Sequence, residues 1–201
     1  MSPSKAEQRE ATVVALITEA RRQFARDGYA AVSLAGIVDA LGLTKGALYH
    51  HFTNKAALFQ AVVERIQAQV AERVVAAAEA RPDAWGQLTA GCEAFLRASA
   101  DPEVQRIMLI DGPAVLGWDD WRALDDASSG RHLREALQAV VDDGVLAPQP
   151  VEPLTHLLSG AMNEAALWLA RSDDPRDLDD TVAALLALLD ALRVAPGDYH
   201  D

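Results

Sequence analysis

Apolar side chains recur at three- and four-residue intervals along most of the chain, which is the spacing that places them on one face of a helix. Runs of Val, Ile and Thr that alternate with polar residues, as in a strand, are absent. The pattern therefore predicts an all-α fold of about nine helices. We place them at about 7–27, just after Ser33, and at 45–51, 54–80, 84–99, 103–110, 119–142, 154–171 and 176–193.

Glycines and prolines mark where these helices end. Gly28 suits a left-handed stop after the first helix, and Gly42 permits the sharp turn after the second. The stretch 111–121 holds two glycines and one proline, which predicts a loop or a broken helix. The following helix has a potential kink near 128–130. The stretch 145–153 has three prolines and predicts a connector, and 195–201 predicts a frayed tail.

Charge divides this chain of 201 residues into two parts. Residues 1–60 hold seven Lys/Arg and five Asp/Glu, a net charge of +2, whereas residues 61–201 hold eleven and twenty-five, a net charge of −14. The total of −12 taken alone argues against nucleic acid as a partner. The mildly basic front end nevertheless indicates a surface for an acidic partner.

Other features bear on the compartment. Cys92 is the single cysteine, so no disulfide forms within the chain, and we expect a cytoplasmic protein. The N-terminal stretch carries charges through its only apolar part and does not read as a signal peptide. No charge-free apolar run reaches the length of a transmembrane helix, so we expect no membrane contact.

The stretch GLTKGALYHHFTNKAALF, residues 42–59, carries two of the three lysines in the chain. Two short helices joined by a tight turn that contains glycine are typical of a helix-turn-helix, whose second helix enters the DNA major groove. Small residues after Lys45 allow that helix to approach DNA closely, and its free N–H groups favour a phosphate. Tyr49 and His50 can donate to phosphate oxygens, and Leu48 and Phe52 point inward.

These residues also resemble the N-terminal domain of TetR-type transcriptional repressors. The similarity runs through SLAGIVDALGLTKGALYHHFTNKAALF, from Ser33 to Phe59, with Phe24 and Gly28 ahead of it. The resemblance implies that one set of positions faces double-stranded DNA, namely Ser33, Thr44, Lys45, Gly46, Ala47, Tyr49, His50 and Lys55. Ser33 can equally serve only as a helix cap, and His51 can equally pack against the next helix.

The same resemblance implies a homodimer that reads a palindromic operator and releases it when a small molecule binds. It divides the chain into a DNA-binding domain, 1–53, and an effector-binding and dimerisation domain, 54–201, with the helix 54–80 as connector. The segments LIDGPAVLGWDDW and NEAALWLA also resemble the body of some family members. Whether the effector acts as an inducer or a co-repressor stays open.

Two sets of residues in the body are candidates for these tasks. Tryptophans, methionines and polar groups beside apolar stretches predict an effector pocket, with core packing or solvated capping as the alternative: Met108, Asp111, Trp118, Trp121, Met162, Asn163 and Trp168. Apolar stripes on the last two helices predict the dimer interface: Leu157, Ala161, Leu185, Leu189 and Leu192. The tryptophans suit an apolar or aromatic effector, and an acidic rim suits a cationic one.

Enzymatic and metal-binding patterns are missing from the sequence. We find no glycine-rich phosphate loop, G-x-S-x-G or H-E-x-x-H, and no metal-ligand spacing of Cys, His and Asp. We therefore expect no enzyme, metal or cofactor. Adjacent acidic pairs such as Asp125-Asp126 read as a solvated face, and Cys92 reads as an inert buried thiol. The alternative function is a helical small-molecule-binding or interaction protein whose DNA-binding head is inactive.

Overall fold

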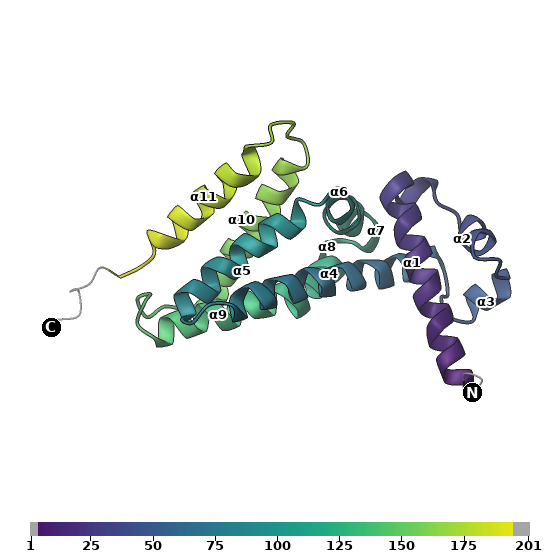
Figure 1. Ribbon diagram of the computed structural model, residues 1–201, viewed down its shortest axis with the longest axis horizontal. Coiled ribbons are helices and arrows are strands. Elements are labelled where there is room, and N and C mark those ends of the chain that lie inside the picture. Colours follow the sequence, from purple (N-terminus) through teal and green to yellow (C-terminus); the bar gives the residue numbers. More distant parts are fainter. Residues whose placement is uncertain (1–3, 195–201) are drawn as a thin grey trace. The chain divides into compact units, whose positions relative to one another are not determined.

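The computed structural model describes residues 4–194, and these residues form helices joined by short connections (Figure 1). The predicted all-α fold is therefore confirmed. The predicted tail at 195–201 lies outside the described residues. Contacts between residues group the chain into two compact units, one with residues up to 66 and Pro102–Arg122, the other with Gln67–Asp101 and the residues from Ala123 onward.

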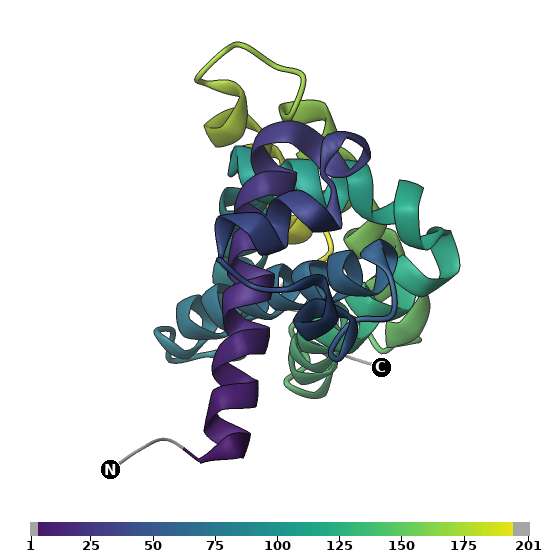
Figure 2. The ribbon, with the colours of Figure 1, turned by 90° about the vertical axis from the view of Figure 1, so that its right-hand side faces the viewer.

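Unit 1 is built on α1 (Lys5–Ala31), which begins with a capping box in which Ser4 and Glu7 bond to each other's backbone N–H. Gly28 interrupts this helix with φ of +77°, so the predicted stop is present and one further turn follows it. α2 (Leu34–Ala40) and α3 (Lys45–Tyr49) come next, and α2 contacts both α1 and α3 (Figure 2).

The turn between α2 and α3 depends on Gly42, whose φ of +64° suits a residue without a Cβ. α4 (Lys55–Glu79) then starts at Asn54, whose side chain accepts a 2.8 Å hydrogen bond from the N–H of Ala57. An aromatic cluster forms part of the core of this unit. The ring of Phe24 lies 5.7 Å from that of Tyr29 and 5.1 Å from that of Phe59.

The segment after residue 101 is more helical than the sequence indicated. α6 (Pro102–Val104), the π-helical segment η1 (Gln105–Asp111) and α7 (Gly112–Leu116) follow one another directly. Of the two predictions for 111–121, the broken helix is the one the structure shows. Gly117, with φ of +85°, separates α7 from α8 (Trp118–Asp125).

In unit 2 the central helix is α5 (Ala84–Ser99), which contacts α9 (Arg131–Asp142), α10 (Val151–Leu169) and α11 (Asp177–Asp190). The predicted kink near 128–130 is present in the π-helical segment η2 (Asp126–Gly130), where Ser128 leaves helical geometry. The predicted connector 145–153 is wrong in its last three residues. α10 begins at Val151, because Pro153 falls in its first turn, where a missing N–H costs nothing. Among the helices at residues 4–194, none has the length and apolar character needed to cross a bilayer.

Candidate nucleic-acid interface and cavity

α3 presents its polar side chains to solvent because its apolar ones hold it to the unit. Leu48 and Phe52 are both buried, as predicted. Thr44 caps the helix, and its Oγ1 accepts a 3.2 Å hydrogen bond from the N–H of Ala47. Lys45 and His50 are exposed, and Tyr49 keeps 56% of its surface in solvent although it is aromatic. The helix thus offers a cation and two hydrogen-bond donors.

Gly46 has no conformational or packing reason to be glycine within the chain. A Cβ built there would have Thr44 Oγ1, 3.8 Å away, as its nearest neighbour, which is ordinary van der Waals contact. Glycine also lowers the stability of a helix relative to alanine, by about 1 kcal/mol. The residue therefore suits a surface that another molecule must approach closely.

Lys55 lies at the start of α4 and packs against its own unit. Its Nζ stands 4.2 Å from the centre of the Tyr29 ring and 3.4 Å from the carbonyl oxygen of Ala30, to which it donates. Partial burial lowers the pKa of this amine. A lysine has three N–H donors, so these contacts leave donors for a further acceptor.

Two residues with open alternatives acquire defined surroundings. Ser33 caps α2, and its Oγ accepts a 3.0 Å hydrogen bond from the N–H of Gly36. The ring of His51 lies 5.1 Å from that of His50. Desolvation lowers the pKa of His51, and the neighbouring charges of His50 and Arg9 lower it further. Since it is partly buried and disfavoured as a cation, His51 is a weaker candidate for a phosphate contact than His50.

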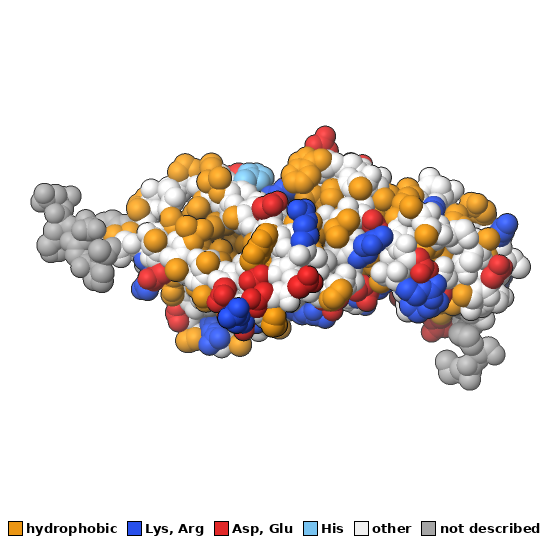
Figure 3. Space-filling model, turned by 90° about the horizontal axis from the view of Figure 1, so that it is seen from above, with side chains coloured by type: hydrophobic (Ala, Val, Ile, Leu, Met, Phe, Trp, Pro, Cys, Tyr) orange, Lys and Arg blue, Asp and Glu red, His pale blue; other side chains and the backbone are white. Residues whose placement is uncertain are grey.

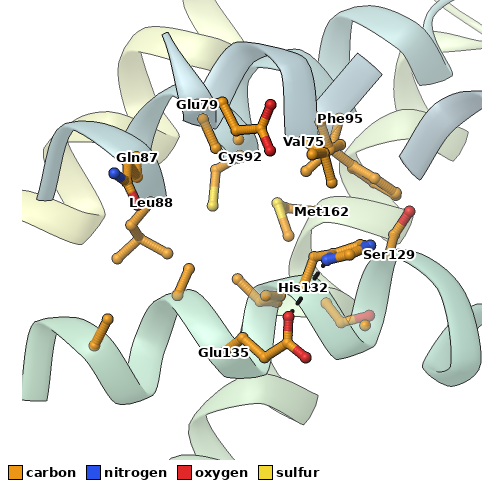
Figure 4. A pocket seen from close by; sticks show the side chains of 18 of the residues that line it. Val75, Glu79, Gln87, Leu88, Cys92, Phe95, Ser129, His132, Glu135 and Met162 are labelled. Carbon is orange, nitrogen blue, oxygen red and sulfur yellow. Dashed lines mark ion pairs between the residues drawn. The ribbon is translucent and has the colours of Figure 1, made fainter. Parts of the chain in front are cut away.

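A second feature is a cavity of about 310 Å³ within unit 2. The walls are mainly apolar, with Leu88, Phe95 and Leu133 among them, and they come from α4, α5, the end of α8, η2, α9 and α10. Figure 4 shows the sulfur atoms of Cys92 and Met162 facing the open centre, and His132 beside Glu135. The volume is at the lower end of the range for small-molecule sites, about 300–1,000 Å³.

Four of the seven predicted effector residues belong to unit 1 and are not among the residues that line this cavity: Met108, Asp111, Trp118 and Trp121. Trp121 is buried and its Nε1 donates a 2.7 Å hydrogen bond to the carbonyl oxygen of Met108. Trp118 is exposed with its ring 5.2 Å from that of Trp121. Asp111 accepts hydrogen bonds from the N–H of Tyr29 and from Arg106.

The other three predicted effector residues lie on α10. Met162 lines the cavity, Trp168 is half exposed, and Asn163 is buried with its Nδ2 3.4 Å from Asp125 Oδ2. The interpretation of Asp125 as part of a solvated face is wrong, because Asp125 is buried and lines the cavity. Ser159 also lines the cavity and was missed. Two spacings point to them, since Asp125 follows the buried Trp121 by four residues, and Thr155, Ser159 and Asn163 form a polar row at four-residue intervals.

The predicted dimer residues separate into two groups. Leu157 and Ala161 are exposed on α10, Leu157 with 71% of its surface, whereas Leu185 and Leu189 are buried within the protomer and Leu192 is partly buried. Leu188, which the sequence reading missed, is exposed on α11 beside exposed alanines. In Figure 3 apolar side chains gather over the part of the surface that α11 occupies.

Within residues 4–194, no three His, Cys, Asp or Glu side chains come together in an arrangement that could hold a metal ion. Two features of the described residues suit the binding of another molecule: the exposed face of α3 in unit 1 and the cavity in unit 2. The first offers donors to an extended acceptor, and the second offers an apolar enclosure to a small molecule.

Comparison with known proteins gives matches over both units. Residues 16–62 match the family model for bacterial regulatory proteins of the tetR family, and residues 85–192 match a tetracyclin repressor-like C-terminal domain. The HTH-type transcriptional repressor Rv1474c of Mycobacterium tuberculosis is 31% identical over 177 residues, covering 87% of this chain and 89% of that protein. The HTH-type transcriptional repressor AcnR of Corynebacterium diphtheriae is 27% identical over 165 residues, covering 82% and 84%.

A solved structure extends this similarity to the whole fold. The crystal structure of a TetR-family transcriptional regulator from Pectobacterium atrosepticum superposes with a TM-score of 0.78 at 37% sequence identity. The match covers 96% of this chain and 99% of that one.

Proposed function

The chain belongs to the TetR family of transcriptional regulators, and from this premise we propose that it represses transcription at a palindromic operator until a small-molecule effector releases it. The family is one of DNA-binding regulators and not of enzymes. The observation that carries the proposal is the exposed face of α3, where Lys45, Tyr49 and His50 stand beside a glycine that the fold does not require.

We assign the DNA contacts to α3 and its flanks. Gly46 and Ala47 allow close approach to the major groove, and Lys45 and Tyr49 supply donors for base edges or phosphates. Thr44 and Ser33 hold the helix starts, His50 donates to phosphate, and Lys55 adds positive charge at the start of α4. The strong negative charge of residues 61–201 repels DNA, so only the basic front end approaches it.

We assign effector binding to residues 54–201 and in particular to the cavity of unit 2. A ligand changes DNA affinity only if it binds the two functional states unequally. In the dimer that we propose, an occupied cavity favours an arrangement in which the two heads no longer match half-sites about 34 Å apart. Because the target that we propose is operator DNA, we infer a cytoplasmic location.

Selection of bound duplexes from a random DNA library tests the regulator assignment directly. We expect the wild type to enrich a palindrome, and Lys45→Ala to lose about 1–3 kcal/mol of operator affinity if the lysine reads a base. If Lys45 instead contacts a phosphate, the slope of log affinity against log salt concentration should become shallower by about one unit in the variant. Arg73→Ala, an exposed arginine in unit 2, is the matched control and should bind as the wild type does.

The alternative predicts a different result. A small-molecule-binding protein with an inactive head would enrich no sequence even at low salt, and Lys45→Ala would change nothing. Enrichment that survives equally well in Lys45→Ala would leave the protein a DNA binder but would remove α3 from the interface.

A further inference from the structure

The first turns of α1 carry two cations in places that disfavour the helix. Residues 4–11 are exposed, and in Figures 1 and 2 this end of α1 projects past the other helices of unit 1. Lys5 is the first residue of the helix, where the free N–H groups already carry partial positive charge. Arg9 follows four residues later, so it is a neighbour of Lys5 on the helix surface and the two charges repel.

No carboxylate among residues 4–194 offsets these two charges. The arginines further along α1 each pair with a carboxylate: Arg21 with Glu103, Arg22 with Glu19 and Arg26 with Asp27. Lys5 and Arg9 have no such partner within the described part of the chain. Glu7 accepts the N–H of Ser4, and Glu10 starts about 100° around the helix from Arg9. Lys5 and Arg9 are therefore available to an anion of another molecule.

The face of α1 that carries these cations is the face that holds the helix-turn-helix further along. Gln23 lies about five turns after Lys5 and therefore starts from the same side of the helix. Gln23 is buried, and its Nε2 donates a 3.3 Å hydrogen bond to the carbonyl oxygen of Gly36 in α2. Leu16, two turns after Arg9, is buried on this face as well. Lys5 and Arg9 thus continue the side of α1 on which α2 packs.

Arg9 also lies close to the end of α3. Desolvation is the main cause that lowers the pKa of His51, and the charges of His50 and Arg9 add to it. Solvent and salt screen a charge over larger distances, so this effect requires Arg9 to be near His51. His51 directly follows His50, to which we assign a phosphate contact. The cations of α1 and the donors at the end of α3 are therefore near one another in unit 1.

We propose that Lys5 and Arg9 form a second DNA contact, in which the first turns of α1 bind backbone phosphates beside the groove that α3 enters. This inference rests on the proposed function, in which α3 meets the operator. A phosphate between two cations attracts both of them, so binding offsets the repulsion that they cause in the free helix. Arginine presents several N–H donors in a fixed fork that suits a phosphate, and lysine adds a flexible point charge.

The match to the family does not imply this contact. The family model for the DNA-binding part covers residues 16–62, so Lys5 and Arg9 lie ahead of the matched region. A phosphate contact fixes orientation and adds affinity without reading bases. The first turns of α1 should therefore strengthen binding to every DNA sequence, whereas α3 selects among sequences.

Salt-dependent binding to the selected operator tests this contact. Fluorescence anisotropy of the full chain at about 0.05–0.3 M salt gives the slope of log affinity against log salt concentration. The slope should become shallower by about one unit in Lys5→Gln and in Arg9→Gln, and by about two units in the double variant. Affinity should fall about two- to fivefold for each substitution. Arg9→Lys keeps the charge and should keep the wild-type slope.

Controls separate a contact from an effect of folding or net charge. Arg22→Gln is the matched control, because it removes the same charge from an exposed arginine on a different face of α1, where Glu19 already offsets it. It should bind with the wild-type slope. Lys5→Gln and Arg9→Gln remove a repulsion between exposed side chains, so the melting temperature should stay equal or rise. Affinity and stability should thus not fall together.

Several results would overturn the proposal. If the double variant Lys5→Gln/Arg9→Gln binds the operator with wild-type affinity and slope, the α1 contact is wrong and the regulator assignment stands. A slope that becomes equally shallow in Arg22→Gln would show an effect of net charge and no contact at α1. Selection of a different palindrome by the double variant would show that these residues read bases, so the phosphate assignment would be wrong. If the wild type binds no duplex at low salt, the proposed function fails, and the α1 contact fails with it.

Discussion

The backbone N–H of Tyr29 donates a 2.9 Å hydrogen bond to Asp111 Oδ2, and so joins the end of α1 to a residue 82 positions later. Arg106 Nε donates to the same oxygen at 3.3 Å, and Arg21 of α1 pairs with Glu103 nearby along that segment. These contacts explain why Pro102–Arg122 groups with the DNA-binding helices in unit 1. Asp111, a candidate for the effector pocket from sequence, thus has a structural task.

Removing that carboxylate should weaken the attachment of this segment to α1. In Asp111→Ala the partly buried N–H of Tyr29 loses its acceptor, which costs about 1–3 kcal/mol. We expect a lower urea midpoint of unfolding, followed by circular dichroism. Asp173→Ala, which changes an exposed aspartate between α10 and α11, should leave the midpoint unchanged. Equal midpoints for the two variants would show that the Asp111 contact contributes nothing.

Gly28 should tolerate no side chain. Its φ of +77° is unfavourable for other residues, by about 1–2 kcal/mol, and a Cβ there would overlap the guanidinium of Arg106. Gly28→Ala should therefore lower the free energy of unfolding by at least about 1–2 kcal/mol. Arg106→Ala in the same chain removes the overlap and should recover part of the loss. A Gly28→Ala protein as stable as the wild type would contradict this account of the α1 break.

The sequence was most informative where local chemistry decides the structure. Caps at Ser33, Thr44 and Asn54, and the glycine turn at Gly42, define the helix-turn-helix from within a few residues. The cavity was harder to predict, because its walls come from segments up to about 90 positions apart. Periodicity shows that a residue such as Trp121 is on an apolar face, and does not show whether that face meets the core or a ligand.

Gly46 provides a test in which stability and DNA affinity separate. Gly46→Leu adds a good helix former at a site with open space, so stability should stay equal or rise by up to about 1 kcal/mol. Operator affinity should fall by about tenfold or more, because the added side chain keeps α3 from the major groove and breaks base contacts. Fluorescence anisotropy with the selected operator measures this. Ala76→Leu, exposed on α4, should change neither quantity, and an unchanged affinity in Gly46→Leu would place the DNA elsewhere.

Cys92 should be chemically inert in the folded protein. Burial raises the pKa of its thiol to about 12, against about 8.5 in an unfolded chain. At pH 8 the reactive thiolate is then at least about a thousandfold scarcer in the folded state, so modification by an aromatic disulfide reagent should be slow until urea is added. The folded state keeps this proton to a higher pH than the unfolded state does. The free energy of unfolding should therefore fall as the pH rises from about 9 toward 12. Rapid modification of native protein would show that the cavity exposes the thiol.

The exposed apolar face of α10 and α11 should be the contact between two copies of the chain. Leu157 keeps 71% of its surface exposed, Leu188 52% and Trp168 50%, which is unfavourable for a monomer in water. Pairing of α10 and α11 about a two-fold axis buries all three in a four-helix arrangement.

Leu157→Asp should therefore produce monomers in sedimentation at micromolar concentration, and operator affinity should fall with the loss of the second head. Val14→Asp is the matched control, since Val14 is 58% exposed on α1 and lies outside this face. A wild type that sediments as a monomer, or a Leu157→Asp variant that stays a dimer, would move the interface away from α10.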